Sequence, residues 1–153
     1  MPDFFSYPHL ARLKAAEGLI LKNVIYHNWI NNARPAERFE FLDKLELQFD
    51  GMNLVITVPE TDDQGLTLAD AFDAEKYRLQ ILHDFGGKMD IRSDNMNSNV
   101  LWENNIGKKL KNLRAEQEGD NSYSNSALLF DFGTEKLEVR PGMDGVIIEP
   151  FDE

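Results

Sequence analysis

Two stretches of similar sequence predict how this chain is built: GLILKNV occupies residues 18–24, and GKKLKNL occupies residues 107–113. A second pair follows in the same order, with LELQF at residues 45–49 and LLFDF at residues 128–132. An internal repeat predicts the architecture of a chain before any single residue is interpreted. The shared positions are mostly apolar residues or glycine, so the repeat predicts folding and not chemistry.

A third pair keeps the same order, with GLTL at residues 65–68 and GVII at residues 145–148. The numbering offset between the copies falls from 89 to 83 and then to 80, because the first copy is longer at 25–44 and at 59–64. Length changes confined to loops are typical of a duplicated unit. The alternative is two unrelated β-meanders, since alternating apolar residues arise in any β protein.

Each copy predicts a helix, a strand, a hairpin and a closing strand. In the first copy, Ser6 can cap a helix that contains Pro8 in its first turn, and Asp50-Gly51 is a strong hairpin signal. The first copy, about 6–68, predicts a helix over 6–17 and strands over 19–30, 41–49, 52–58 and 66–68. The second copy, about 99–151, predicts a helix over 99–105, with Leu101 and Trp102 facing the core, and strands over 109–118, 127–132, 136–140 and 145–149.

Residues 69–98 lie between the copies and have no counterpart. The alternation of Tyr77, Leu79 and Ile81 favours a strand, and Lys88 to Arg92 could be its partner arm. A helix over 74–84 competes with this prediction, because Ala74, Tyr77 and Ile81 also share a helical face. Residues 93–98 are predicted to be a polar linker.

The pattern as a whole predicts one α+β domain over residues 1–153, mainly antiparallel β. A small sheet with one apolar face must cover that face. We therefore expect two tandem copies of a helix–strand–hairpin–strand unit that share one core with pseudo-twofold symmetry.

The composition narrows the classes of function. The chain has no cysteine, which excludes disulfides and a thiol nucleophile, and its net charge is −11, which disfavours nucleic-acid binding. Its first residues lack the basic and apolar regions of a secretory signal, and no apolar run is long enough to span a bilayer. We expect a cytoplasmic protein with no membrane or nucleic-acid partner. The sequence does not indicate an oligomeric state.

The residues that could carry chemistry form no recognisable motif. His9, His27 and His83 lack the spacing of a local metal site, and each is expected to be exposed or satisfied by hydrogen bonds. The serines fall mainly in the predicted polar loops at 93–98 and 122–126, without a nucleophile elbow. We therefore predict no catalytic residue, no metal and no cofactor, and an enzyme is the less favoured class.

The first functional hypothesis is a protein-binding module, an inhibitor or immunity-type protein that neutralises a basic partner. Acidic loops would steer the basic surface, and an aromatic residue at a strand end would anchor it. The alternative is a small-molecule-binding domain with a pocket between the two repeats, in which the two tryptophans would report the ligand. The predicted partner-binding residues are Trp29, Glu37, Glu40, Glu60, Asp62 and Asp63.

Overall fold

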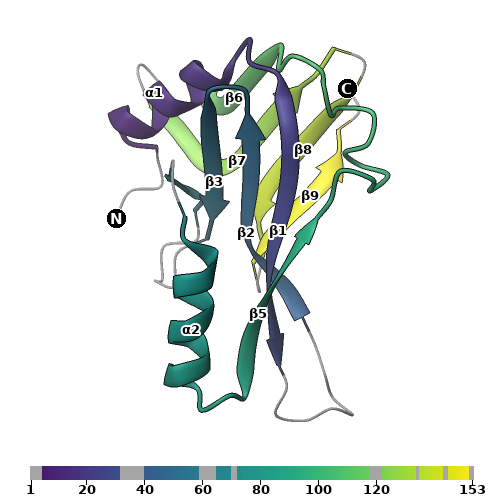
Figure 1. The fold of residues 1–153 in the computed structure, drawn as a ribbon. Helices are drawn as coiled ribbons and strands as arrows, with labels where there is room; N and C mark the ends of the chain where they lie inside the picture. The colour runs from purple at the N-terminus through teal and green to yellow at the C-terminus, as the bar shows by residue number, and fades with distance from the viewer. Residues whose placement is uncertain are drawn as a thin grey trace.

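Within the residues that the structure describes, the chain forms two antiparallel sheets and two helices (Figure 1). This computed structural model describes residues 5–31, 40–58, 65–69, 72–117, 122–133, 135–142 and 145–151. The architecture confirms a mainly antiparallel α+β fold. None of the described helices is long and apolar enough to cross a membrane.

The first sheet has the strand order β4-β3-β2-β1-β5. Its first four strands follow one another along the chain as a meander, and β5 joins the free edge of β1. The β2–β3 hairpin turns at Asp50-Gly51 as predicted, and Gly51 has a φ of 103°. The strands of this sheet are β1 (Leu21–Asn31), β2 (Glu40–Phe49), β3 (Met52–Thr57), β4 (Thr67–Ala69) and β5 (Met89–Asn95).

The second sheet is also a meander, with the strand order β6-β7-β8-β9. Its strands lie where the second copy predicts them, although β7 begins earlier than expected and β6 begins later. They are β6 (Asn112–Gln117), β7 (Tyr123–Asp131), β8 (Lys136–Pro141) and β9 (Val146–Pro150).

The two meanders pair their strands in the same register. When a residue of the first meander is matched to its counterpart in the second by the three aligned stretches, the residues that face them on the neighbouring strands match as well. The matching pairs of facing residues are Val24–Leu47 and Leu113–Phe130, Leu45–Ile56 and Leu128–Val139, Leu47–Leu54 and Phe130–Leu137, and Ile56–Leu68 and Val139–Ile148.

A short backbone clasp joins the segments that lead into β1 and β6. We define the clasp as residues 18–21 and 107–110. Ile20 and Lys109 face each other as an isolated antiparallel pair at its centre. The backbone N–H groups of the first and last residues of each segment donate hydrogen bonds to carbonyls of the other segment. The N–H···O distances are 2.7 Å from Gly18 to Leu110, 2.7 Å from Gly107 to Leu21, 3.0 Å from Leu21 to Lys108 and 2.9 Å from Leu110 to Leu19.

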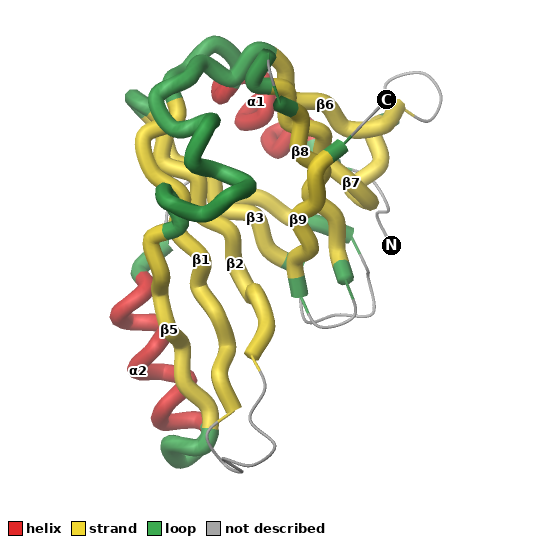
Figure 2. The backbone as a smooth tube through the Cα atoms, turned by 90° about the vertical axis from the view of Figure 1, so that its right-hand side faces the viewer, coloured by secondary structure: helices red, strands yellow, loops and turns green. Residues whose placement is uncertain are grey.

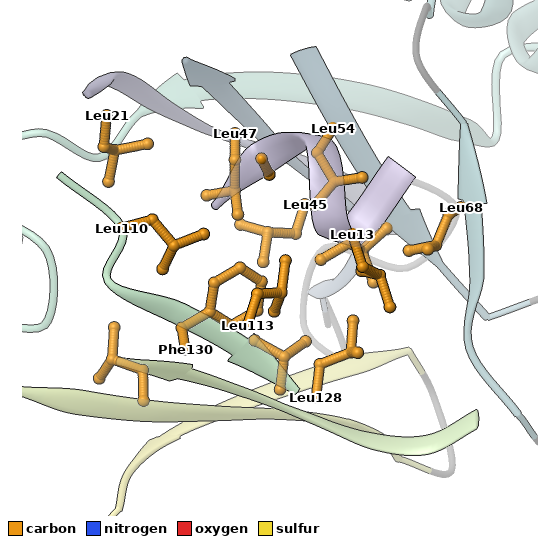
Figure 3. Close-up of a cluster of buried hydrophobic side chains, with 14 of the residues drawn as sticks. Leu13, Leu21, Leu45, Leu47, Leu54, Leu68, Leu110, Leu113, Leu128 and Phe130 are labelled. Atoms are coloured by element: carbon orange, nitrogen blue, oxygen red, sulfur yellow. The ribbon is translucent and has the colours of Figure 1, made fainter. Parts of the chain in front are cut away.

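The main hydrophobic core receives side chains from both sheets and from α1 (Tyr7–Ala16). Figure 3 shows leucines from these elements meeting Phe130 of β7. The α1 helix begins as predicted, because the Ser6 side chain accepts the N–H of His9 at 3.4 Å. Leu13 and Ala16 are the buried residues of this helix.

The favoured prediction of a strand around Tyr77 is wrong, because residues Ala74–Asp84 form the helix α2. Asp73 caps this helix by accepting the N–H of Lys76 at 3.1 Å. Its C-terminus ends in Gly86 and Gly87, both with positive φ, which L residues with side chains rarely adopt. The helical spacing of the apolar residues is the one that the fold uses, because Leu79 is 56% exposed while Ile81 is buried.

The predicted helix over 99–105 is also absent, and a run of turns takes its place. The side chain of Asn99 accepts the N–H of Leu101, and the side chain of Asn105 donates to the carbonyl of Leu101. Asparagine side chains that bond nearby backbone groups compete with helix formation. The expected burial is confirmed: Trp102 is 0% exposed, and Leu101 packs against the main core.

Candidate functional site

The candidate site lies where β1, β2 and β5 extend beyond the second sheet and α2 packs beside them (Figure 2). We call this part of the molecule the α2 lobe. It comprises α2 with its flanking residues 72–73 and 85–88, β5, and the ends of β1 and β2 nearest the 32–39 segment. The lobe brings together residues far apart in the chain, because β1 pairs with β2 on one side and with β5 on the other.

Trp29 forms a small separate core in the α2 lobe. It is 9% exposed, stacks on Phe41 at a centroid distance of 5.7 Å, and meets Phe85 edge-on at 5.6 Å. Its indole N–H donates to the Tyr77 hydroxyl at 3.2 Å, and that hydroxyl donates to Asp43 at 3.1 Å. The predicted anchor Trp29 is therefore buried, and it supports the exposed Phe85 from beneath.

Glu40, the second predicted partner-binding residue, begins β2 at an exposed position. One of its carboxylate oxygens lies 2.6 Å from a terminal nitrogen of Arg92, which also donates from Nε to Asp94 at 2.7 Å. The hydrogen bond that Arg92 donates to Asp94 is the main cause that raises the pKa of Arg92. Glu40 is therefore part of a surface ion-pair network.

The other predicted site residues, Glu37, Glu60, Asp62 and Asp63, lie outside the described residues. Of the predicted set, the structure thus places Trp29 and Glu40 in the same lobe, on paired strands.

A buried polar network lies on the α2-facing side of the first sheet and was not predicted. His27 is 2% exposed, and its Nε2 atom lies 2.8 Å from Oε1 of Glu46. Its Nδ1 atom lies 2.7 Å from the hydroxyl oxygen of Ser93, which faces it across the β1–β5 pair. The second oxygen of Glu46 accepts from the side-chain amide of Gln48 at 2.9 Å.

Aromatic and charged groups enclose this network. Phe72, just before α2, meets the His27 ring edge-on at 4.8 Å and Tyr77 at 5.3 Å. The ammonium of Lys44 lies over both aromatic rings, 5.4 Å from the centre of Phe72 and 4.9 Å from that of Tyr77. The entrance to α2 therefore covers the histidine and separates it from solvent.

The sequence contains an indication of this network. Lys44, Glu46 and Gln48 alternate with the apolar residues of β2, so they share the face of the strand that is turned away from the main core. The expectation that histidines are exposed or satisfied agrees with the structure, since His27 has two partners while the side chain of His83 is 89% exposed. Ser93 falls in the predicted polar linker 93–98, and this prediction is wrong in part, because residues 93–95 belong to β5.

Two hollows are candidate ligand sites. One, about 410 Å³, lies between α2 and β5 and has Ser93 in its lining. The other, about 700 Å³, lies between α1 and the second sheet and is lined by Leu10, Leu13, Lys14, Glu17, Leu113, Arg114, Ala115, Glu116, Gln117, Tyr123, Ala127, Leu128, Leu129, Glu138 and Phe151. We call the larger hollow the α1 groove.

Across the part of the chain that the structure describes, no three histidine, aspartate or glutamate residues are grouped so as to hold a metal ion.

Comparisons with protein-family models, with curated proteins and with solved structures find no match.

Proposed function

We propose that this chain is a cytoplasmic, acidic protein-binding module, an inhibitor or immunity-type protein that neutralises a basic partner through the α2 lobe. The observation that carries the proposal is the exposure of Leu79 at 56% and Phe85 at 44%, on and just after α2. Large apolar side chains, aromatic ones in particular, are enriched in the cores of protein–protein interfaces.

The charge of the chain supports a basic partner. The net charge is −11, and opposite charge accelerates the encounter of two proteins while short-range apolar contacts hold them together. Exposed carboxylates of Glu75 and Asp84 lie on α2 itself. Phe85 rests on the buried Trp29, so its ring is held in place before binding, which lowers the entropic cost of association.

The proposal is tested by capturing partners from the native host with immobilised protein and locating the contact by hydrogen exchange. The variants are L79S/F85S, which removes the apolar side chains, and V100S, which removes an equally apolar side chain, 75% exposed, outside the lobe. We expect a basic partner to protect α2, to bind V100S normally and to bind L79S/F85S at least about tenfold more weakly. A partner that protects another surface, or that binds both variants equally, would contradict the proposal.

A second candidate function is small-molecule binding in the α1 groove. Its volume of about 700 Å³ falls in the range usual for ligand pockets. It is lined by α1 of the first copy and by the sheet of the second copy, as expected for a pocket between the repeats. Neither tryptophan is in its lining, so tryptophan emission is a poor reporter of this site.

The groove is better tested by thermal shift in a ligand screen. Ala127 lies in the lining and is half-buried, and A127W would fill the space. A ligand that raises the melting temperature of the native protein and leaves that of A127W unchanged would support this function. A screen that moves neither melting temperature would count against it.

We also propose that the chain arose by tandem duplication and has pseudo-twofold symmetry about the clasp. Two observations support this. The strand registers of the two meanders match residue for residue, at the same numbering offsets that relate the aligned stretches of sequence. The clasp bonds also occur in equivalent pairs. The N–H of Gly18 donates to the carbonyl of Leu110, and the N–H of Gly107 donates to the carbonyl of Leu21.

A further inference from the structure

We propose that Ser93, His27 and Glu46 form an acyl-transfer site, with the Ser93 hydroxyl as nucleophile and a short-chain carboxylic ester as substrate. The three residues come from adjacent strands β5, β1 and β2. A serine, a histidine and a carboxylate joined by two hydrogen bonds are the arrangement that activates a hydroxyl on unrelated folds, where geometry and not sequence position identifies it. This inference is independent of partner binding by the α2 lobe.

The hydrogen bonds determine where the protons lie. One oxygen of Glu46 accepts the side-chain amide of Gln48, and Nε2 of His27 lies 2.8 Å from the other oxygen. A carboxylate can only accept hydrogen bonds, so with Glu46 as a carboxylate the hydrogen of this pair lies on Nε2 of His27. In neutral imidazole the other nitrogen then has a free lone pair, so the hydroxyl of Ser93 donates to Nδ1 at 2.7 Å.

Burial differs along the chain of hydrogen bonds as catalysis requires. His27 and Glu46 are buried, at 2% and 7% exposure, whereas Ser93 is exposed. The base is therefore shielded from water, while the serine occupies an exposed position on the edge strand β5. Three apolar residues, Ile30, Ala74 and Ile91, line the hollow of about 410 Å³ beside Ser93, and its charged border is formed by Glu75, Arg78, Asp90 and Arg92. The apolar part of this hollow suits a short acyl group.

The reaction needs only the ester and water. The Ser93 oxygen attacks the carbonyl carbon as its proton passes to Nδ1 of His27, and the resulting imidazolium is stabilised by Glu46. The bond from the carbonyl carbon to the alkoxy oxygen then breaks, and the alcohol leaves with the proton from His27. Water attacks acyl-Ser93 in the same way, which releases the carboxylic acid and restores the Ser93 hydroxyl.

The test uses the full-length protein and a fluorophosphonate ester, which a serine oxygen attacks at phosphorus with loss of fluoride. Peptide mass spectrometry measures the modification of each serine over time. Ser126 is the matched internal control, because it is also exposed and its oxygen lies 2.7 Å from another hydroxyl, that of Ser124. We expect Ser93 to react about 10²–10⁴-fold faster than Ser126, the usual contribution of a positioned base.

Two variants separate the roles. S93A should lose hydrolysis of p-nitrophenyl acetate, whereas S126A should retain it. E46Q tests Glu46 as a positioning residue: kcat for p-nitrophenyl acetate should fall with KM little changed, because the amide stabilises the imidazolium less well in the transition state. A merely structural role for Glu46 would lower the melting temperature and leave kcat of the folded protein unchanged. Labelling of Ser93 no faster than that of Ser126 in the folded protein, or ester hydrolysis by S93A at the native rate, would overturn the proposal.

Discussion

The Tyr26 hydroxyl joins the first sheet to the turns that lead into the second. It accepts the indole N–H of the fully buried Trp102 at 2.7 Å. Burial is the main cause that raises the pKa of Tyr26 above 10.0, and the hydrogen bond from Trp102 opposes it. A buried donor that loses its acceptor destabilises a fold more than the bond itself stabilises it.

Replacing Tyr26 by phenylalanine should therefore lower the free energy of unfolding by about 1–3 kcal/mol. The native protein should also lose stability as pH rises above about 10, because the unfolded chain releases this phenolic proton at lower pH than the folded chain. Urea unfolding at neutral and alkaline pH measures both effects. Y26F should lose less stability with rising pH than Y7F, whose phenol is 86% exposed in the native protein. Equal alkaline slopes for the two variants would contradict this account.

Gly18 and Gly107 both adopt a φ of 85°, and a Cβ added to either would meet nothing within 4 Å. The cost of an alanine there is thus conformational and not steric, about 1–2 kcal/mol for a left-handed residue. We expect G18A and G107A to lower the free energy of unfolding by similar amounts. Denaturant titration of the two variants checks this. A loss at one position only would show that the two halves of the clasp are not equivalent.

These residues illustrate what the sequence could predict. Gly18 and Gly107 recur at matching places in the repeat, and so do the apolar positions of the strands. The repeat therefore predicts where these residues lie in the fold. Glu46 and Ser93 could not be found in this way, because they meet His27 only through the register of neighbouring strands. Alternation assigns a residue to one face of a sheet, but it does not say which residue lies beside it.

The α2 helix shows the same limit for an element. Its apolar residues fit two periods, and the residues that decide between them lie at its ends, in Asp73 and in Gly86-Gly87. The turns at 99–105 replace the predicted helix for a related reason, since the side chains of Asn99 and Asn105 bond the backbone groups of Leu101. The strands of the two meanders were predicted well because meanders need only local pairings, whereas β5 pairs with the distant strand β1.

The cap of α2 should be measurable by itself. D73A removes the acceptor of the Lys76 N–H and should destabilise the helix by about 0.5–2 kcal/mol. D84A is the matched control, because Asp84 lies at the opposite end, where a negative charge is unfavourable to the helix dipole. Hydrogen exchange of the α2 amides should be faster in D73A and unchanged or slower in D84A. Similar acceleration in both variants would refute the role of Asp73.

At the scale of the whole molecule, the clasp ties together segments 89 positions apart. Ile20 and Lys109 form a pair without hydrogen bonds of their own, since the bonds run between their neighbours. Their Cα atoms should then be about 4.5 Å apart, which is compatible with a disulfide.

The I20C/K109C double variant should therefore form a disulfide, and the absence of other cysteines prevents mispairing. The closed loop is long, so oxidation should raise the free energy of unfolding by about 2–4 kcal/mol over the reduced form. Melting curves with and without reductant measure the difference. Failure to oxidise would contradict the register of the clasp.

The position of β5 determines which strand of the first sheet could pair with a second copy of this chain. An uncovered sheet edge can pair with the edge of another copy, and proteins guard such edges with added strands, charges or bulges. In the first sheet, β5 occupies the edge that β1 would otherwise present. In the second sheet, β6 ends the strand order, and it carries exposed Arg114 and Glu116 and an irregular register after Ala115. The open edge of the first sheet is thus moved from β1 to β5, which carries the exposed Arg92, while the β6 edge of the other sheet is protected by charge and by distortion.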